Sequence, residues 1–287
     1  MKRSRLLTAR WTAVACLAML AWPVGVEGQP TKKEEAPGVL YSNVSGVVGP
    51  IWVSAAELTR GGGGIRWGLL AKNQAEDWQR TLRLLPRLET KGTGIHEVAE
   101  ENCKVFSNDL TWPSVHEPIR SDLLALVRTS KEVFAGTVVA HTPGFLAGSL
   151  ATVLTVEVTD GLRFEPPAQA RSVLYVAYPQ AHFVMGGLVF CGNHLKGGHL
   201  PEVGSRILVL SHYPPADTDN SLLRVSEPEV FSAFDGSNLF LPPDLKYSVA
   251  LKGVSSFNEL LETVRHLLAE PPELRTKSGQ ANDGGSR

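Results

Sequence analysis

The chain has 287 residues and a formal net charge of −1, and 43% of its residues are hydrophobic and 20% are charged. This composition is that of an ordinary globular protein, and a chain without a basic excess is not a typical nucleic-acid-binding protein. Three cysteines are too few for a disulfide-rich scaffold or a cysteine-based zinc finger. The 27 glycines and 19 prolines indicate many turns, which favours β structure.

Residues 1–28 have the three parts of a secretory signal peptide. Four basic residues up to Arg10 precede an apolar run over 11–22, and small residues lead to Gly28. The apolar run is shorter than the roughly 20 residues that a membrane-spanning helix needs. We therefore expect cleavage after Gly28, a secreted or periplasmic protein, and no membrane span after cleavage. A retained N-terminal membrane anchor is the alternative.

Residues 29–120 show little regular patterning. The stretch 29–38 is polar and charged, a composition typical of disorder. Gly61–Gly64 would lose much backbone entropy on ordering, and Pro86 interrupts a helical pattern that begins at Trp78. We predict a poorly ordered N-terminal region over 29–120.

Residues 121–250 are predicted to form one antiparallel β domain. It begins with a short helix over 121–127, for which Ser121 is the predicted N-cap. Runs of β-branched and aromatic residues then predict strands without intervening crossover helices, which favours an antiparallel barrel or sandwich. The predicted strands cover 133–140, 152–158, 173–178, 183–185, 188–190, 206–210 and 239–241.

Residues 251–270 contain a predicted amphipathic helix. Apolar residues from Phe257 to Leu268 recur at helical spacing, and Ser255 or Ser256 can form a capping box with Glu259. Two consecutive prolines then end the helix, and the polar residues 271–287 are predicted to be a disordered tail.

The order of segments in residues 121–212 resembles that of exported OB-like barrels related to the netrin/TIMP-type module. The resemblance rests on a helix followed by VFAGTVVAHTPGF, TVLTVEVTDGL, VLYVAYP, GGLVFCG and LPEVGSRILVLSHYP. It implies a mainly β fold, an antiparallel OB-like β-barrel flanked by a short N-terminal helix and a C-terminal amphipathic helix. Members that inhibit metalloproteases begin with a cysteine, whereas the predicted mature chain begins with Gln29, so inhibition is not implied.

Cys191, His194 and His199 are the candidate metal ligands. A thiolate with imidazoles is a zinc-type ligand set, but the spacing Cys-x2-His-x4-His is not a standard zinc signature, and the glycine-rich segment favours a structural loop with no bound metal. In an oxidising compartment, Cys103 and Cys191 could instead form a disulfide. Their spacing is equally compatible with two independent thiols.

Known catalytic patterns are incomplete in this sequence. The run that starts at His96 lacks the second histidine of a zincin, because that position is Glu100, and no G-x-S-x-G nucleophile motif occurs. We therefore predict an exported, non-enzymatic binding or structural protein of the cell envelope or extracellular space, without a cofactor and with an unknown protein or envelope partner. The alternatives are a metal-binding protein or hydrolase that uses the Cys191 loop, and a membrane-anchored accessory subunit.

Overall fold

A computed structural model of the protein describes residues 36–41, 50–85, 87, 95–97, 122–164, 172–193, 200–211, 223–225, 230–233, 239–241, 245 and 248–269. The chain divides into two compact units, Met1–Glu34 and Glu35–Arg287, and every described residue belongs to the second. Among the helices of these ranges, none is long and apolar enough to cross a membrane.

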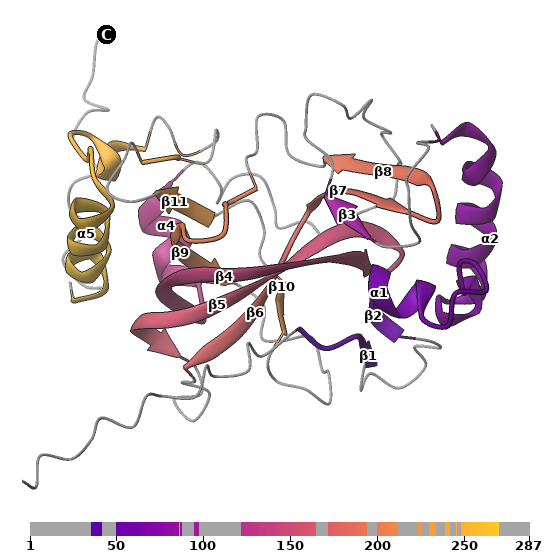
Figure 1. Ribbon diagram of the computed structural model, residues 1–287. Helices are drawn as coiled ribbons and strands as arrows, with labels where there is room; N and C mark the ends of the chain where they lie inside the picture. The colour runs from indigo at the N-terminus through magenta and orange to yellow at the C-terminus, as the bar shows by residue number, and fades with distance from the viewer. Residues whose placement is uncertain are drawn as a thin grey trace, which may run out of the picture. The chain divides into compact units, whose positions relative to one another are not determined.

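Strands and helices follow one another as shown in Figure 1. The strands are β1 (Val39–Tyr41), β2 (Pro50–Ser54), β3 (His96–Glu97), β4 (Glu132–Leu146), β5 (Ser149–Phe164), β6 (Val173–Tyr178), β7 (Gln180–Met185), β8 (Leu188–Asn193), β9 (Arg206–Ser211), β10 (Leu223–Val225) and β11 (Val230–Ala233). The α-helices are α1 (Ala55–Thr59), α2 (Lys72–Thr81), α4 (Leu123–Thr129) and α5 (Phe257–Ala269), and the 3-10 helices are η1 (Trp67–Leu69), η2 (Leu82–Leu84) and η6 (Val249–Leu251).

The main sheet is built around the long β4–β5 hairpin. Its order is β1-β2-β4-β5-β6-β10, with β9 on the first part of β4 and β11 on β9. All pairs are antiparallel except β10 with β6. The prediction of a mainly β, antiparallel fold with a few helices is therefore confirmed. The described strands do not close into a barrel through hydrogen bonds, since β10 and β11 are edge strands that pair with different partners.

Strand β4 has two different neighbours along the edge that faces away from β5. Its residues 132–137 pair with β9, and its residues 144–146 pair with β2. Three register shifts between β4 and β5 lie in the first half of the hairpin. Such bulges bend a strand and increase its twist, which allows one long strand to belong to two differently oriented parts of the sheet.

A second sheet, β3-β7-β8, packs at the tip of the β4–β5 hairpin. Five aromatic side chains fill the space between the two sheets, α2 and η1, and the ring centroid of Trp78 lies 5.1 Å from that of Phe145 and 5.8 Å from that of Phe190. The Trp78 Nε1 group also donates a hydrogen bond of 2.7 Å to the carbonyl oxygen of Gly148 in the hairpin turn. The five residues are Trp67, Trp78, Phe145, Phe183 and Phe190.

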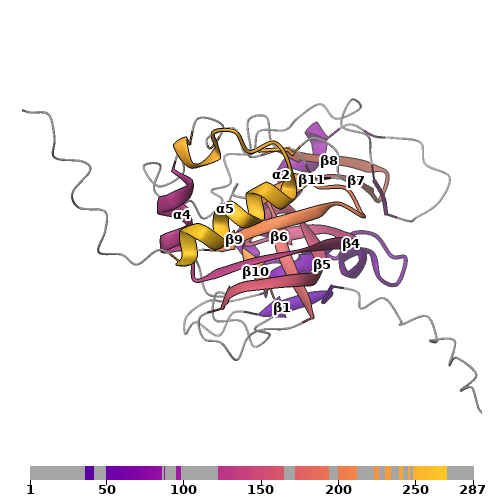
Figure 2. The same cartoon turned by 90° about the vertical axis from the view of Figure 1, so that its left-hand side faces the viewer.

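Helices α4 and α5 cover the other end of the hairpin, and Figure 2 shows α5 lying across β9. The buried stripe of α5 is the one expected from the sequence, Phe257, Leu260, Leu261 and Val264. It contacts Val133 of β4 and Leu208 of β9 within one apolar cluster. The capping box is also confirmed, because Glu259 Oε2 accepts hydrogen bonds of 2.7 Å from Ser255 N and 3.1 Å from Ser256 N.

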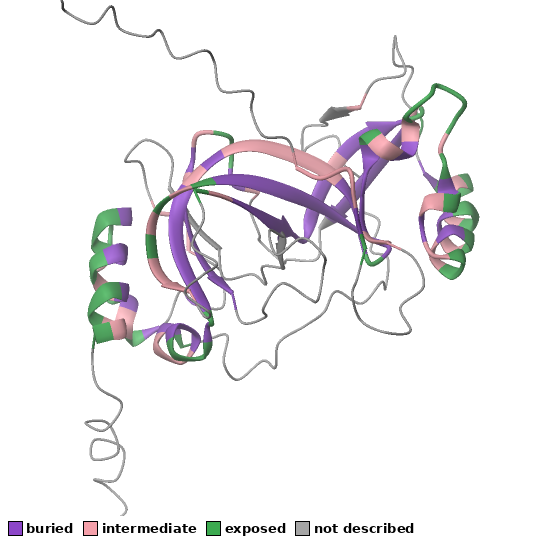
Figure 3. Ribbon diagram, turned by 90° about the horizontal axis from the view of Figure 1, so that it is seen from below, coloured by how far each residue is buried: buried purple, intermediate pink, exposed green. Residues whose placement is uncertain are grey.

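Alternation along the strands separates two further apolar clusters. Leu154 of β5 and Val176 of β6 face Phe134 and Val209 on one side, whereas Val153 and its neighbours face Trp52 on the other. Figure 3 shows that most of the hairpin is buried, with a half-buried stretch in the middle of β4. Both faces of the sheet are thus covered along the first half of β5, whereas residues 157–164 of β5 are exposed or half-buried.

Residues 50–85 differ from the poorly ordered region expected over 29–120. They form β2, α1, η1, α2 and η2, and Trp52 and Trp78 are 0% and 1% exposed. The cause is contact with residues far along the chain, since β2 pairs with β4 and Trp78 reaches the hairpin turn. Gly61–Gly64 is exposed, as expected for a spacer.

Two local predictions are corrected by the structure. The N-cap of α4 is Asp122 rather than Ser121, because Asp122 Oδ1 accepts a hydrogen bond of 3.0 Å from Leu124 N. Residues 239–241 form no strand, and only Phe240 makes a β-bridge. The two prolines that follow in the sequence lack the N–H groups that would extend a ladder.

Replacing Gly144 of β4 by alanine should lower the free energy of unfolding by about 1–3 kcal/mol. A Cβ atom at this position would lie 2.7 Å from Trp52 Cη2 and 2.8 Å from Ser54 Cα, so β2 would have to move. Chemical denaturation measures the change. Gly63→Ala is the matched control, because its Cβ would meet nothing within 4 Å. An equal loss in both variants would contradict the close approach of β2 and β4.

Candidate functional site

Cys191 is part of a structural element rather than an open loop. It lies on β8, is 3% exposed, and pairs across the ladder with His182 of β7. Val184 and Val189 share its face, whereas Phe190 packs on the opposite side with the aromatic cluster, as strand alternation predicts.

The sulfur of Cys191 is bonded in a disulfide. The other cysteines of the chain, Cys16 and Cys103, lie outside the described residues. A disulfide sulfur is not a thiolate, and only the thiolate is a metal ligand or a nucleophile. Cys191 is therefore not available as a ligand while this bond exists.

His194 and His199, the other two candidate ligands, lie outside the described residues. His182 is half-buried and has contacts of its own. Within the ranges that the structure describes, no group of three His, Cys, Asp or Glu side chains could hold a metal ion.

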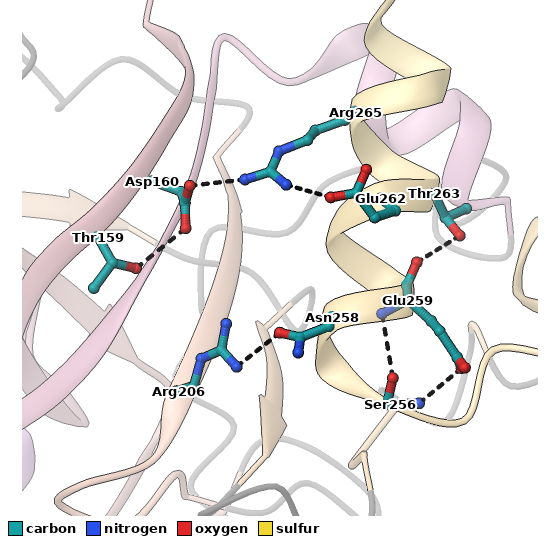
Figure 4. Close-up of polar contacts among 9 residues, drawn as sticks. All are labelled: Thr159, Asp160, Arg206, Ser256, Asn258, Glu259, Glu262, Thr263 and Arg265. Atoms are coloured by element: carbon teal, nitrogen blue, oxygen red, sulfur yellow. Dashed lines mark hydrogen bonds and ion pairs between the residues drawn. The ribbon is translucent and has the colours of Figure 1, made fainter.

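A polar cluster joins α5 to the sheet, as shown in Figure 4. Arg265 Nη2 lies 2.8 Å from Asp160 Oδ1 of β5, and Arg265 also pairs with Glu262 on its own helix. Arg206 of β9 donates a hydrogen bond of 2.9 Å to Asn258 Oδ1. These charged groups already have partners within the chain, so the cluster serves to attach α5 rather than to bind a ligand.

The N-terminal cap of α5 contains a titratable group, the carboxylate of Glu259. Hydrogen bonds from Ser255 and Ser256 to its carboxylate lower the pKa of Glu259. Since the pKa is lower in the folded state, the stabilisation is present above the ordinary glutamate value of about 4.3 and is lost as the pH falls through the folded pKa. The difference in melting temperature between the wild type and Glu259→Ala should therefore be larger at pH 7 than at pH 3.

Thermal unfolding at a series of pH values measures this difference. Asn258→Ala is the control, because it removes a neighbouring contact of α5 without a titratable group. A difference for Glu259→Ala that does not change between pH 7 and pH 3 would show that the carboxylate does not cap the helix.

The surface around α2 is positively charged. Residues 50–87 contain six basic and three acidic residues, a net charge of +3 in a chain whose net charge is −1. All six basic side chains are exposed, and exposed residues gather on α2 and on the loop before it (Figure 3). The basic residues are Arg60, Arg66, Lys72, Arg80, Arg83 and Arg87.

Most of these cations have no counter-ion in the described part of the chain. Arg60 pairs with Glu57 at 2.7 Å, and Arg80 pairs with Asp77. The remaining four, Arg66, Lys72, Arg83 and Arg87, make no ion pair with any residue that the structure describes.

Helix α2 holds this surface in place through a narrow apolar stripe. Only Ala75 and Trp78 of the helix are buried, so the rest of its circumference is left for polar side chains. Arg80 and Arg83, together with Glu76 and Gln79, line a hollow of about 630 Å³.

The sequence signal for this surface has two parts, and neither is a catalytic motif. Arg80, Arg83 and Arg87 lie close together in the sequence, although the end of α2 at Thr81 and the proline at position 86 exclude one continuous helical face. The local excess of positive charge in a slightly acidic chain is the second part of the signal. Comparisons with protein-family models, with curated proteins and with solved structures found no significant match to this chain.

Proposed function

We propose that the chain is an exported, non-enzymatic binding or structural protein of the cell envelope or extracellular space. The observation that carries the proposal is the disulfide at Cys191. Disulfides persist in oxidising compartments and are rare in the cytosol. A signal peptide over residues 1–28 would deliver the chain to such a compartment, and cleavage after Gly28 would leave Cys103 as the only possible intramolecular partner of Cys191.

The scaffold of this protein, in our proposal, is an OB-like barrel of the kind found in netrin/TIMP-type modules. Strand β10 is parallel to β6, and β11 is antiparallel to β9. Because β6 and β9 run in opposite directions, β10 and β11 run in the same direction, and they follow each other in the chain. β10 and β11 lie on the two edges of the sheet, and the proposed barrel would close where these edges meet, in the order β4-β5-β6-β10-β11-β9. The apolar cluster of Leu154 and Val209 would be the barrel interior.

Binding is favoured over catalysis because the cations without an ion pair among the described residues lie on exposed positions in and around α2 and not around a reactive side chain. OB barrels bind partners through one face and through variable loops, but a fold alone names no ligand. The four cations around α2 that make no ion pair within the described ranges point to an acidic partner. The metal-binding alternative loses its thiolate to the disulfide at Cys191.

The test is to express the full chain with a tag after Arg287, separate the cell fractions and analyse the protein by mass spectrometry without reduction. We expect a periplasmic or secreted protein that begins at Gln29 and contains a peptide pair linked through Cys103 and Cys191. A cytosolic protein that begins at Met1 with free thiols would contradict the proposal. A membrane-bound protein that keeps residues 11–22 would favour the anchored accessory subunit.

A further inference from the structure

We infer that the surface around α2 docks onto a membrane that contains anionic phospholipids. This surface, the α2 surface, consists of Arg66, Lys72, Arg80, Arg83, Leu84 and Arg87. The inference rests on the proposed function, because it names the acidic partner of the binding surface proposed above.

The cations of the α2 surface lie around one end of the fold. Arg87 makes a β-bridge with Leu188 at the start of β8. Ile65, the residue before Arg66, would be 3.3 Å from a Cβ atom on Gly186 in the β7–β8 turn. Arg66 and Arg87 therefore flank the same hairpin turn, and α2 and η2 connect them along the chain.

An apolar side chain protrudes among these charges. Leu84 of η2 is 69% exposed and follows Arg83 directly. A leucine in water at this position gains nothing from the fold, but it can enter the boundary between headgroups and acyl chains when neighbouring arginines contact phosphate groups. This combination favours a lipid surface over a soluble acidic polymer, which offers no apolar phase.

The glycine loop that precedes α2 carries no side chains, and the charge of the rest of the chain is negative. Gly61–Gly64 is exposed, and a Cβ atom at any of its four positions would meet nothing within 4 Å. The net negative charge of the rest of the chain would orient the molecule, because an anionic membrane attracts the α2 surface and repels the other parts.

The experiment measures vesicle binding by co-sedimentation. The chain that starts at Gln29, which keeps the whole compact unit Glu35–Arg287, is mixed with vesicles of phosphatidylcholine, with or without 30% phosphatidylglycerol. We expect binding to the anionic vesicles only, and weaker binding as the salt concentration rises, because salt screens exposed charges.

Charge reversal tests whether the α2 surface carries the binding. Each cation near an anionic membrane contributes about a fivefold change in affinity, so the double variant Arg83→Glu with Arg87→Glu should bind at least about 25-fold more weakly. Leu84→Ser should weaken binding without any change in charge. The matched control is Arg128→Glu with Lys131→Glu, which reverses two exposed charges near α4 and should leave binding within about twofold of the wild type.

Four results would overturn the inference. The first is equal binding to neutral and anionic vesicles, and the second is an unchanged affinity in the Arg83 and Arg87 variant. The third is an equal loss of affinity in the control variant. The fourth is tighter binding to heparin than to anionic vesicles, which would make an acidic polysaccharide the partner. Circular dichroism and the melting temperature show whether each variant is folded. Vesicle binding is measured on purified protein and does not depend on the compartment in which the cell keeps it. A cytosolic protein that still binds anionic vesicles would therefore contradict the proposed export but not the docking of the α2 surface.

Discussion

Replacing Trp78 by alanine should lower the free energy of unfolding by about 3–5 kcal/mol. The indole is 1% exposed and contacts Trp67, Phe145 and Phe190, so its loss would leave a large cavity in the aromatic cluster. The carbonyl oxygen of Gly148 would also lose the hydrogen bond from Trp78 Nε1. Urea denaturation followed by circular dichroism measures the change.

Two further variants separate the contributions of Trp78. Trp78→Phe keeps an aromatic ring but removes the indole donor, so it should cost clearly less than alanine and still more than the roughly 1 kcal/mol of a single hydrogen bond. Gln79→Ala alters the exposed neighbour on α2 and should change the stability by no more than about 0.5 kcal/mol. A fully stable Trp78→Ala would mean that α2 does not pack against the hairpin tip.

Leu261→Ala should lower the free energy of unfolding by about 2–5 kcal/mol, the usual range for a buried leucine. Leu261 is 3% exposed and lies in the apolar cluster formed by α4, α5, β4 and β9. Its removal weakens the contact that holds the C-terminal helix on the sheet. The melting temperature and the denaturation midpoint should both fall.

Leu84→Ala is the matched control for this variant, because it makes the same chemical change at a side chain that is 69% exposed. It should alter the stability by no more than about 0.5 kcal/mol. If both leucines could be truncated with equally small effects, α5 would be detached from the sheet in solution. A stable Leu84→Ala variant would also show that truncation of this side chain leaves the protein folded.

Local periodicity accounts for the elements that were predicted well. Alternation over 152–158 predicts a segment of β5, and the apolar spacing with the capping box predicts α5 almost to the residue. It also places Val189 and Cys191 on one face of β8. In each case the pattern of apolar residues indicates which side of a single helix or strand is buried. This pattern depends only on residues that are close together in the sequence.

Pairing over long distances explains what the sequence pattern missed. The strand predicted over 133–140 continues to Leu146, through Pro143, which lacks a backbone N–H. Its last residues are supported by β2, which lies about 90 residues earlier in the chain. The tight turn at Ala147 and Gly148 requires positive φ at both residues, which sequence alone signals clearly only for glycine.

The sequence by itself determined that this is a mainly β protein with an amphipathic C-terminal helix, because strand alternation and helical spacing are local properties. Only the tertiary structure decided that residues 50–85 belong to the fold, since Trp78 is anchored 70 residues away at Gly148. It also decided that Cys191 is buried and bonded, and that four of the six cations around α2 make no ion pair with a described residue. Burial and charge pairing depend on which distant segments meet, and no short stretch of sequence contains that information.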